Sequence, residues 1–333
     1  MIVTVTANPS IDRTLRLGAP LARGQVQSAV AAGDEAGGKG ANVAKALTAA
    51  GIATTAILPA DAGDPYLPLL LATGVDVLPV AAGHPVRINL TVTEPDGTTT
   101  KLNAPGALDG ARLDALRAAV LERADGAEWV VLSGSLPEGA PSDWYAQLLA
   151  ELGGSGTRVA VDTSGTALDA VIDRIADDAP VALLKPNADE LHAALVATGI
   201  DPDCAPGDVL ESDRTLAAAA AERLRAARPG LGSVLLTLGA RGAILVSGRG
   251  ALAATPPPTV ARSTVGAGDS ALAGWLIAAI AGGDDAARLA SAVAYGSAAA
   301  ALDGSTAPRP DQTAPGAVAV TPLPASAAAA RKA

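Results

Sequence analysis

Two hydrophobic patterns alternate along the chain and together predict a sheet that is covered by helices. Apolar residues at helical spacing predict helices at 41–50, 67–71 and 271–280. Short, largely apolar segments between such stretches predict buried strands at residues 2–6, 54–59, 75–80, 129–132, 159–162, 181–184, 234–238 and 243–246. From residue 109 onward, strands and helices alternate regularly. We therefore expect an α/β fold with a mostly parallel central sheet and helices on both of its faces.

Regular alternation of polar and apolar residues occurs in two places and predicts a second, smaller sheet. Residues 14–17 alternate in this way, and Asp12 lies just before them, either projecting into a cleft or closing a turn. Residues 86–94 and 98–103 also alternate and flank a Pro-Asp-Gly turn, which predicts a hairpin. We expect these segments to form a small β-sheet lid with strands from about 12–26 and 86–103.

Four of the predicted strands are followed by short segments rich in polar residues and glycine. These segments are 133–137, 162–165, 185–190 and 237–242. Ligands of open α/β sheets gather at the carboxyl ends of the strands, so the four segments are expected to share one binding edge.

The segment Ser263-Thr264-Val265-Gly266-Ala267-Gly268-Asp269-Ser270 precedes a strongly apolar helix. Its glycines permit a tight turn whose N–H groups converge at a helix N-terminus, which predicts an anion cradle. Asp269 follows directly, where it is expected to reach a hydroxyl beside a phosphate and to be kept ionised by the helix N-terminus. This pattern suggests phosphoryl transfer to an alcohol. Taken alone, it fits a loop with a helix cap equally well, and it lacks the Gly-Lys-Ser/Thr of a P-loop.

A second glycine loop, Gly37-Gly38-Lys39-Gly40, opens the helix that is expected to stop near Gly51. Lys39 and Asn42 lie on its first turn, which makes this loop a second candidate site for an anion or a hydroxyl. Lys45 lies further along the helix and is predicted to be a solvated surface charge.

Composition narrows the possible partners. The chain has 333 residues and a formal net charge of −10, which argues against nucleic acid or an anionic membrane surface as a partner. Its one cysteine excludes an internal disulfide and a thiolate metal site. The N-terminal residues predict a strand rather than a secretory signal, and the longest apolar run, 271–281, is too short to span a bilayer. We expect a cytoplasmic protein.

Taken together, residues 4–9, the Gly37–Ala44 segment and the Ser263–Ser270 segment resemble the ribokinase-like sugar kinases, in their phosphofructokinase B branch and most closely its bacterial 1-phosphofructokinase group. The resemblance implies a single ribokinase-like domain over 1–320, with 321–333 as a flexible tail. It also implies ATP and Mg²⁺ as cofactors and a homodimer formed through the lid. The implied reaction is phosphorylation of fructose 1-phosphate. A minor-type 6-phosphofructokinase and a tagatose-6-phosphate kinase remain as alternatives, ahead of a nucleoside kinase or a non-catalytic sugar-phosphate sensor.

The resemblance also implies a role for each candidate residue. Asp269 is implied as the catalytic base, with the backbone of Gly266, Ala267 and Gly268 as the anion hole. The implied substrate-binding residues are Asp12, Gly38 and Asn42 for sugar hydroxyls, Arg87, Lys39, Asn89 and Lys101 for the sugar phosphate, and Ser135. The implied nucleotide-binding residues are Lys185, Asn187, Thr237, Gly239, Gly242 and Thr264. Asn187 and Glu190 are implied to organise Mg²⁺ through water.

Overall fold

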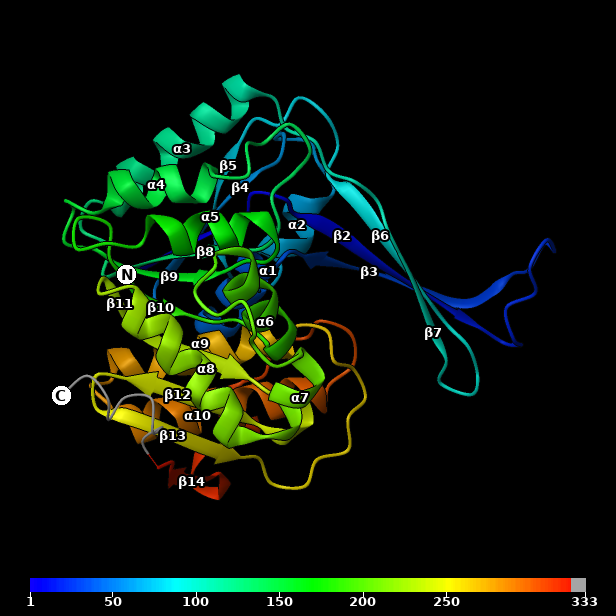
Figure 1. Ribbon diagram of the computed structural model, residues 1–333. Helices are drawn as coiled ribbons and strands as arrows, with labels where there is room; N and C mark the ends of the chain where they lie inside the picture. Colours follow the sequence, from blue (N-terminus) through cyan, green and yellow to red (C-terminus); the bar gives the residue numbers. More distant parts are fainter. Residues whose placement is uncertain (325–333) are drawn as a thin grey trace.

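The computed structural model describes residues 1–324, whose strands form two separate sheets (Figure 1). The larger sheet has ten strands in the order β14-β13-β12-β11-β10-β9-β8-β1-β4-β5. Their bounds are β1 Ile2–Val5, β4 Thr54–Pro59, β5 Asp76–Val80, β8 Trp129–Ser133, β9 Arg158–Asp162, β10 Val181–Leu184, β11 Leu231–Thr237, β12 Ala243–Ser247, β13 Gly250–Thr255 and β14 Ala319–Pro322. Neighbouring strands in the run β11-β10-β9-β8-β1-β4-β5 pair in parallel. Strands β12, β13 and β14 continue the sheet beyond β11 in antiparallel pairs. The predicted mostly parallel sheet is confirmed.

Helices cover both faces of this sheet because alternate strand residues point to opposite sides. The helix bounds are α1 Lys39–Ala49, α2 Tyr66–Leu71, α3 Gly110–Ala124, α4 Trp144–Leu152, α5 Thr166–Arg174, α6 Ala188–Ala197, α7 Gly207–Ser212, α8 Arg214–Ala227, α9 Ala267–Ile280 and α10 Asp285–Ala300, with 3₁₀ turns at Gly239–Arg241, Pro310–Gln312 and Pro315–Ala317. In β8, Val130 and Leu132 belong to a first core under α3, α4, α5, α6 and α8. Trp129 and Val131 belong to a second core under α1, α9 and α10. Across residues 1–324, no helix is long and apolar enough to cross a membrane.

The two largest aromatic side chains of the second core pack against each other. Trp129 of β8 and Trp275 of α9 meet edge to face, with ring centroids 5.6 Å apart and an interplanar angle of 86°. Both rings are almost fully buried. This contact fixes the docking of α9 on the sheet, and α9 is the helix that begins at the predicted anion cradle.

The smaller sheet is an arm that projects from the body in the order β3-β2-β6-β7 (Figure 1). Its strands are β2 Ser10–Leu17, β3 Ala29–Gly37, β6 Arg87–Thr93 and β7 Thr99–Asn103. The predicted hairpin is therefore present. The predicted lid strand over 12–26 is wrong in its bounds, because residues 18–28 connect two strands rather than continue one. Asp12 lies within β2, opposite Glu35 of β3 and Asn89 of β6, and not at the end of a turn.

Two further expectations need correction. Residues 321 and 322, the first two of the expected tail, belong to the edge strand β14 and pair with β13; residues 325–333 lie outside the described part of the chain. Lys45 is not a surface charge. Its ammonium is buried and donates to the carbonyl oxygen of Ala36 and to Ser305, because the root of the lid and the loop after α10 cover this face of α1.

Candidate active site

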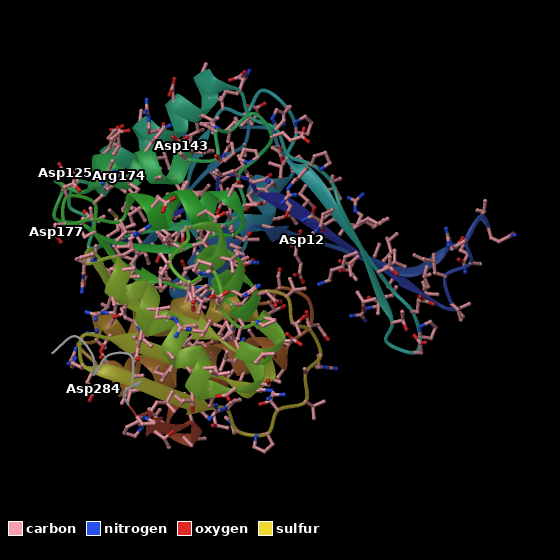
Figure 2. The ribbon with its side chains drawn as sticks, in the orientation of Figure 1. Asp12, Asp125, Asp143, Arg174, Asp177 and Asp284 are labelled. Carbon is pink, nitrogen blue, oxygen red and sulfur yellow. The ribbon has the colours of Figure 1, made fainter. Side chains whose placement is uncertain are left out.

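A cavity of about 930 Å³ lies between the root of the lid, the carboxyl ends of the parallel strands and the start of α9. It is lined by all of the predicted site residues except Lys101. Figure 2 shows Asp12 where the lid leaves the body, away from labelled surface residues such as Asp125 and Asp284. Lys101 is exposed on β7, opposite Thr91 of β6, so the structure does not bring it to this cavity.

The segment predicted to be an anion cradle forms a tight glycine turn at the N-terminus of α9. Gly266 precedes α9 with a φ of 74°, in the left-handed region that L-residues other than glycine rarely adopt. Its carbonyl accepts from the N–H of Ser270 at 2.8 Å, which closes the first turn. The remaining N–H groups of that turn lie at the positive end of the helix beside the cavity. Lys185 adds a full charge there, since a Cβ built on Gly268 would lie 3.4 Å from the Lys185 Nζ.

Asp269 is buried at the floor of the cavity, and one of its carboxylate oxygens accepts a hydrogen bond of 2.8 Å from the Asn42 amide. Burial and the nearby carboxylate of Asp162 raise the pKa of Asp269 to about 6. The hydrogen bond from Asn42 and the charges of Lys39 and Lys185 oppose this rise. We expected the helix N-terminus to keep Asp269 ionised, but burial and the charge of Asp162 act against its ionisation. A carboxylate with this pKa is still mostly ionised at neutral pH and is a stronger base than an ordinary aspartate.

Asp162 is the central charged residue that the sequence did not single out. It ends β9, is fully buried, and accepts from the Lys39 ammonium at 2.9 Å, while the Lys185 ammonium lies 3.1 Å from its other oxygen. Burial opposes the ionisation of Asp162, but Lys185 and Lys39 outweigh it and hold its pKa below the usual range. The sequence feature that could have identified Asp162 is an aspartate at the end of an otherwise apolar strand, at the sheet edge where ligands gather.

Lys39 begins α1 and lines the cavity. Its ammonium contacts Asp162 and lies 3.9 Å from a carboxylate oxygen of Glu190. Burial opposes its charge, but Asp162 and Glu190 outweigh burial and raise the pKa of Lys39. Lys39 and Lys185 thus place two positive charges around Asp162 and near Asp269.

The half of the cavity beneath the lid is lined by polar side chains that hydrogen-bond to one another and to the backbone. The Asp12 carboxylate accepts from the Ser10 hydroxyl at 2.8 Å and from the Asn89 amide at 3.1 Å. The Arg87 guanidinium is half-buried and donates to the backbone carbonyls of Ala104, Pro9 and Asn8 at 2.7 to 3.4 Å. Burial lowers the pKa of Arg87, which stays charged at any physiological pH. Asn8 and Ser10 also line this half, although the sequence analysis gave them no role.

Asn187 and Glu190, the predicted magnesium pair, form a capping box at the start of α6. The Asn187 side chain accepts from the Glu190 N–H at 2.8 Å, and one Glu190 oxygen accepts from the Asn187 N–H at 2.9 Å. The other Glu190 oxygen faces the Lys39 ammonium at 3.9 Å and accepts no hydrogen bond in the capping box. Within residues 1–324, no group of three or more His, Cys, Asp or Glu side chains has a metal-binding arrangement. The donors therefore fit Mg²⁺ held mainly by phosphates and water, and do not fit direct chelation.

The other half of the cavity is suited to a nucleotide. Thr237 ends β11 and donates its N–H to Pro186 at 3.1 Å, which joins the β10 and β11 loops. Gly239 and Gly242 lie in the next turn with φ values of 51° and 98°. The wall opposite comes from small residues of α10 and from a proline-rich loop: Ala292, Val293, Gly296, Ser297, Ala300, Pro256, Pro257 and Pro258. None of the residues that line the described cavity is aromatic.

A buried carboxylate at the first turn of a helix that begins at a glycine turn, with two lysines close by, suits the transfer of a phosphoryl group to an alcohol. Comparison with known proteins agrees. Residues 6–312 match the family model described as "pfkB family carbohydrate kinase". The chain therefore belongs to the pfkB family of carbohydrate kinases and is a phosphotransferase, as the predicted resemblance implied.

Individual relatives are similar over most of the chain. A 1-phosphofructokinase of Rhodobacter capsulatus is 38% identical over 89% of this chain and 89% of its own. The ATP-dependent 6-phosphofructokinase isozyme 2 of Escherichia coli is 34% identical over 81% of this chain and 82% of its own. The crystal structure of phosphofructokinase-2 from Escherichia coli in complex with substrates and products has a TM-score of 0.83 at 31% identity and covers 93% of this chain and 96% of its own.

Proposed function

We propose that this chain transfers the γ-phosphoryl group of ATP to fructose 1-phosphate and releases fructose 1,6-bisphosphate and ADP. The observation that carries the proposal is the position of Asp269: a buried, basic carboxylate at the first turn of α9, where the lid half of the cavity meets the nucleotide half. An attacking hydroxyl held beneath the lid would lie between this carboxylate and the cradle.

The reaction balances on these groups. The free sugar hydroxyl oxygen forms a bond to the γ-phosphorus as the bond from that phosphorus to the bridging oxygen of ADP breaks. Asp269 takes the hydroxyl proton. The cradle formed by Gly266, Ala267 and Gly268, with Lys185 beside it, stabilises the charge that develops on the transferred group. The lid keeps out water, which would otherwise accept the phosphoryl group.

The sugar phosphate is assigned to the lid half. Arg87 is its charged ligand, and Asp12 and Asn89 are assigned to the sugar hydroxyls on the same side. Three of the five guanidinium N–H donors of Arg87 are engaged by backbone carbonyls, so donors remain for an anion. Lys101 has no part in this assignment within one chain.

Mg²⁺ is assigned to the nucleotide phosphates, with the Glu190 oxygen outside the capping box reaching it through water. When bound, the ion neutralises charge on the β- and γ-phosphates. Asn187 orients Glu190 through the capping box, and Lys185 and Lys39 remain paired to Asp162 beside this position.

A homodimer through the lid is part of the proposal. Val26, Val30 and Leu102 lie on the projecting arm with exposed fractions of 102%, 70% and 59%. Exposed apolar side chains gathered on one arm favour burial against a second copy. Light scattering of the intact chain should give a dimer, and Val30→Glu should shift it toward monomer. A monomeric wild-type chain at micromolar concentration contradicts this part. A cytoplasmic location stays a prediction from the sequence.

The substrate is tested by coupled release of ADP with fructose 1-phosphate, fructose 6-phosphate and tagatose 6-phosphate, each at the same concentration below its KM. We expect the highest kcat/KM with fructose 1-phosphate, for two reasons. Two relatives named 1-phosphofructokinase are 38% and 36% identical to this chain, and Lys39 occupies the Gly-Gly-Lys-Gly loop. A preference for either 6-phosphate would reassign the lid half, and no turnover with any of the three would overturn the proposed substrate class.

A further inference from the structure

Lys45 of α1 is a buried cation that the proposed mechanism does not use. It is 7% exposed, and its ammonium donates to the Ala36 carbonyl at 2.9 Å and to the carbonyl and hydroxyl of Ser305, both at 3.3 Å. In the described part of the chain it forms no ion pair within 4.0 Å. Burying an ammonium without a paired carboxylate is costly. The three hydrogen bonds of Lys45 offset this cost, and they join two segments that lie far apart along the chain.

Ser305, the main partner of Lys45, is also held from the lid. The Glu35 carboxylate of β3 accepts from the Ser305 N–H at 2.8 Å and from its hydroxyl at 2.7 Å. The hydroxyl thus donates to Glu35 while it accepts from Lys45. Ser305 is buried in the loop that follows α10, far from both residues along the chain. Four hydrogen bonds fix this one residue to the root of the lid and to α1.

The loop held in this way packs against the anion cradle. A Cβ built on Gly266 would lie 3.9 Å from the Cα and Cβ of Ser305 and 3.9 Å from the amide nitrogen of Asn42. Asn42 is one turn before Lys45 on α1 and donates to Asp269. One face of α1 therefore holds the base through Asn42 and the loop behind the cradle through Lys45.

We propose that Lys45 is a positioning residue that fastens the root of the lid to the loop behind the anion cradle, and so keeps the sugar half and the phosphoryl half of the site aligned. Ala36 and Glu35 belong to β3, the lid strand that runs directly into the glycine loop at Gly37 and Gly38. Movement of the lid is thereby transmitted to the turn at Gly266. As a statement about catalysis, this inference rests on the proposed function; as a statement about coupling between the two segments, it does not.

The kinetic test compares Lys45→Met with the wild type and with Arg117→Met, which removes a partly exposed cation on α3. We expect Lys45→Met to lower kcat at least about tenfold while the KM for ATP changes by less than about threefold, since the nucleotide slot is not touched. Arg117→Met should leave both constants unchanged. A folded Lys45→Met with kcat within about twofold of the wild type overturns the proposal.

A double-mutant cycle with Ser305→Ala separates positioning from an independent effect. If Lys45 acts through Ser305, the double variant should be no slower than Lys45→Met alone, within about twofold. Losses in kcat that multiply overturn the proposal. Should Lys45→Met fail to fold, the single variant Ser305→Ala decides: a fall in kcat of at least about threefold is expected, and an unchanged kcat overturns the proposal.

Hydrogen exchange on the full chain without substrate tests the coupling apart from the activity. In Lys45→Met, or in Ser305→Ala if the first does not fold, amide exchange should accelerate together in β3 and in residues 266–270, and stay unchanged in α3. Acceleration in β3 alone would overturn the proposed link. If the wild type turns over no fructose phosphate, the proposed function is wrong. The exchange result still tests the coupling between β3 and residues 266–270.

Discussion

Replacing Asp269 by asparagine should abolish most activity and at the same time stabilise the protein at neutral pH. The side chain is 6% exposed, and its pKa rises from an ordinary value of 3.8 to about 6. Because the folded protein holds this proton more tightly than the unfolded chain, stability is highest below the unfolded pKa and is lost as the pH rises through the folded one. The lost stability is about 3 kcal/mol at pH 8, at about 1.4 kcal/mol for each tenfold change in proton affinity.

Asp269→Asn removes this loss because an amide carries no charge, and its oxygen is able to accept the hydrogen bond from Asn42. Urea unfolding should therefore show a gain of about 3 kcal/mol at pH 8, about half of that at pH 5 and none below pH 3.5. The gain should come with a fall in kcat of about 10² to 10⁴, the usual contribution of a general base.

The stability measurement and the kcat measurement test separate parts of this prediction. A variant that is less stable than the wild type at pH 8 would show that Asp269 is stabilised as a carboxylate in the folded protein, against the effect of burial argued above. A variant whose kcat stays within about tenfold of the wild type would remove Asp269 as the base, whatever its stability. Asp284→Asn, a surface helix cap on α10, is the matched control for stability and should show no gain at pH 8.

The remaining predictions concern the groups around Asp269. In the wild type, kcat should fall about tenfold per pH unit below pH 6 as the base is protonated, as measured at saturating substrates. Asp162→Asn should move this acid limb to lower pH, because it removes a negative charge that raises the pKa of Asp269; an unmoved limb would assign it to the substrate phosphates instead. Gly266→Ala should cost about 1 to 2 kcal/mol in urea unfolding, because the residue has a φ of 74°, and should lower kcat; an unchanged kcat would mean that the cradle tolerates the shift. Arg87→Met should raise the KM for the sugar phosphate while that for ATP stays constant, and an equal rise in both would place Arg87 outside the sugar half.

The apolar segments made the sheet and most of the cavity predictable, because a strand buried on both faces must be apolar throughout. Strand β3 escaped prediction for the opposite reason. Six of its nine residues are exposed, so it carries no hydrophobic pattern, and its backbone hydrogen bonds to β2 hold it in place. Strand β14 at the sheet edge is similar, with three exposed residues of four.

The errors within the site have a common physical source. Periodicity shows which face of a helix is apolar, but not which distant segment covers the other face, and for Lys45 that segment is 260 residues away. Asp162 and Lys39 are 123 residues apart, so no local pattern reveals their pairing. The pKa of Asp269 depends on burial and on Asp162, whereas the sequence shows only the helix N-terminus.

The edge-to-face contact between Trp129 and Trp275 gives this chain an optical reporter of its own. The sequence contains three tryptophans and no phenylalanine, and these two rings absorb within 5.6 Å of each other in a rigid, asymmetric setting. Two indoles so close and nearly perpendicular are expected to couple and to contribute a strong near-ultraviolet circular dichroism signal. Because Trp275 lies on the helix that begins at the cradle, the signal would follow any shift of that helix on the sheet during turnover, without an attached label.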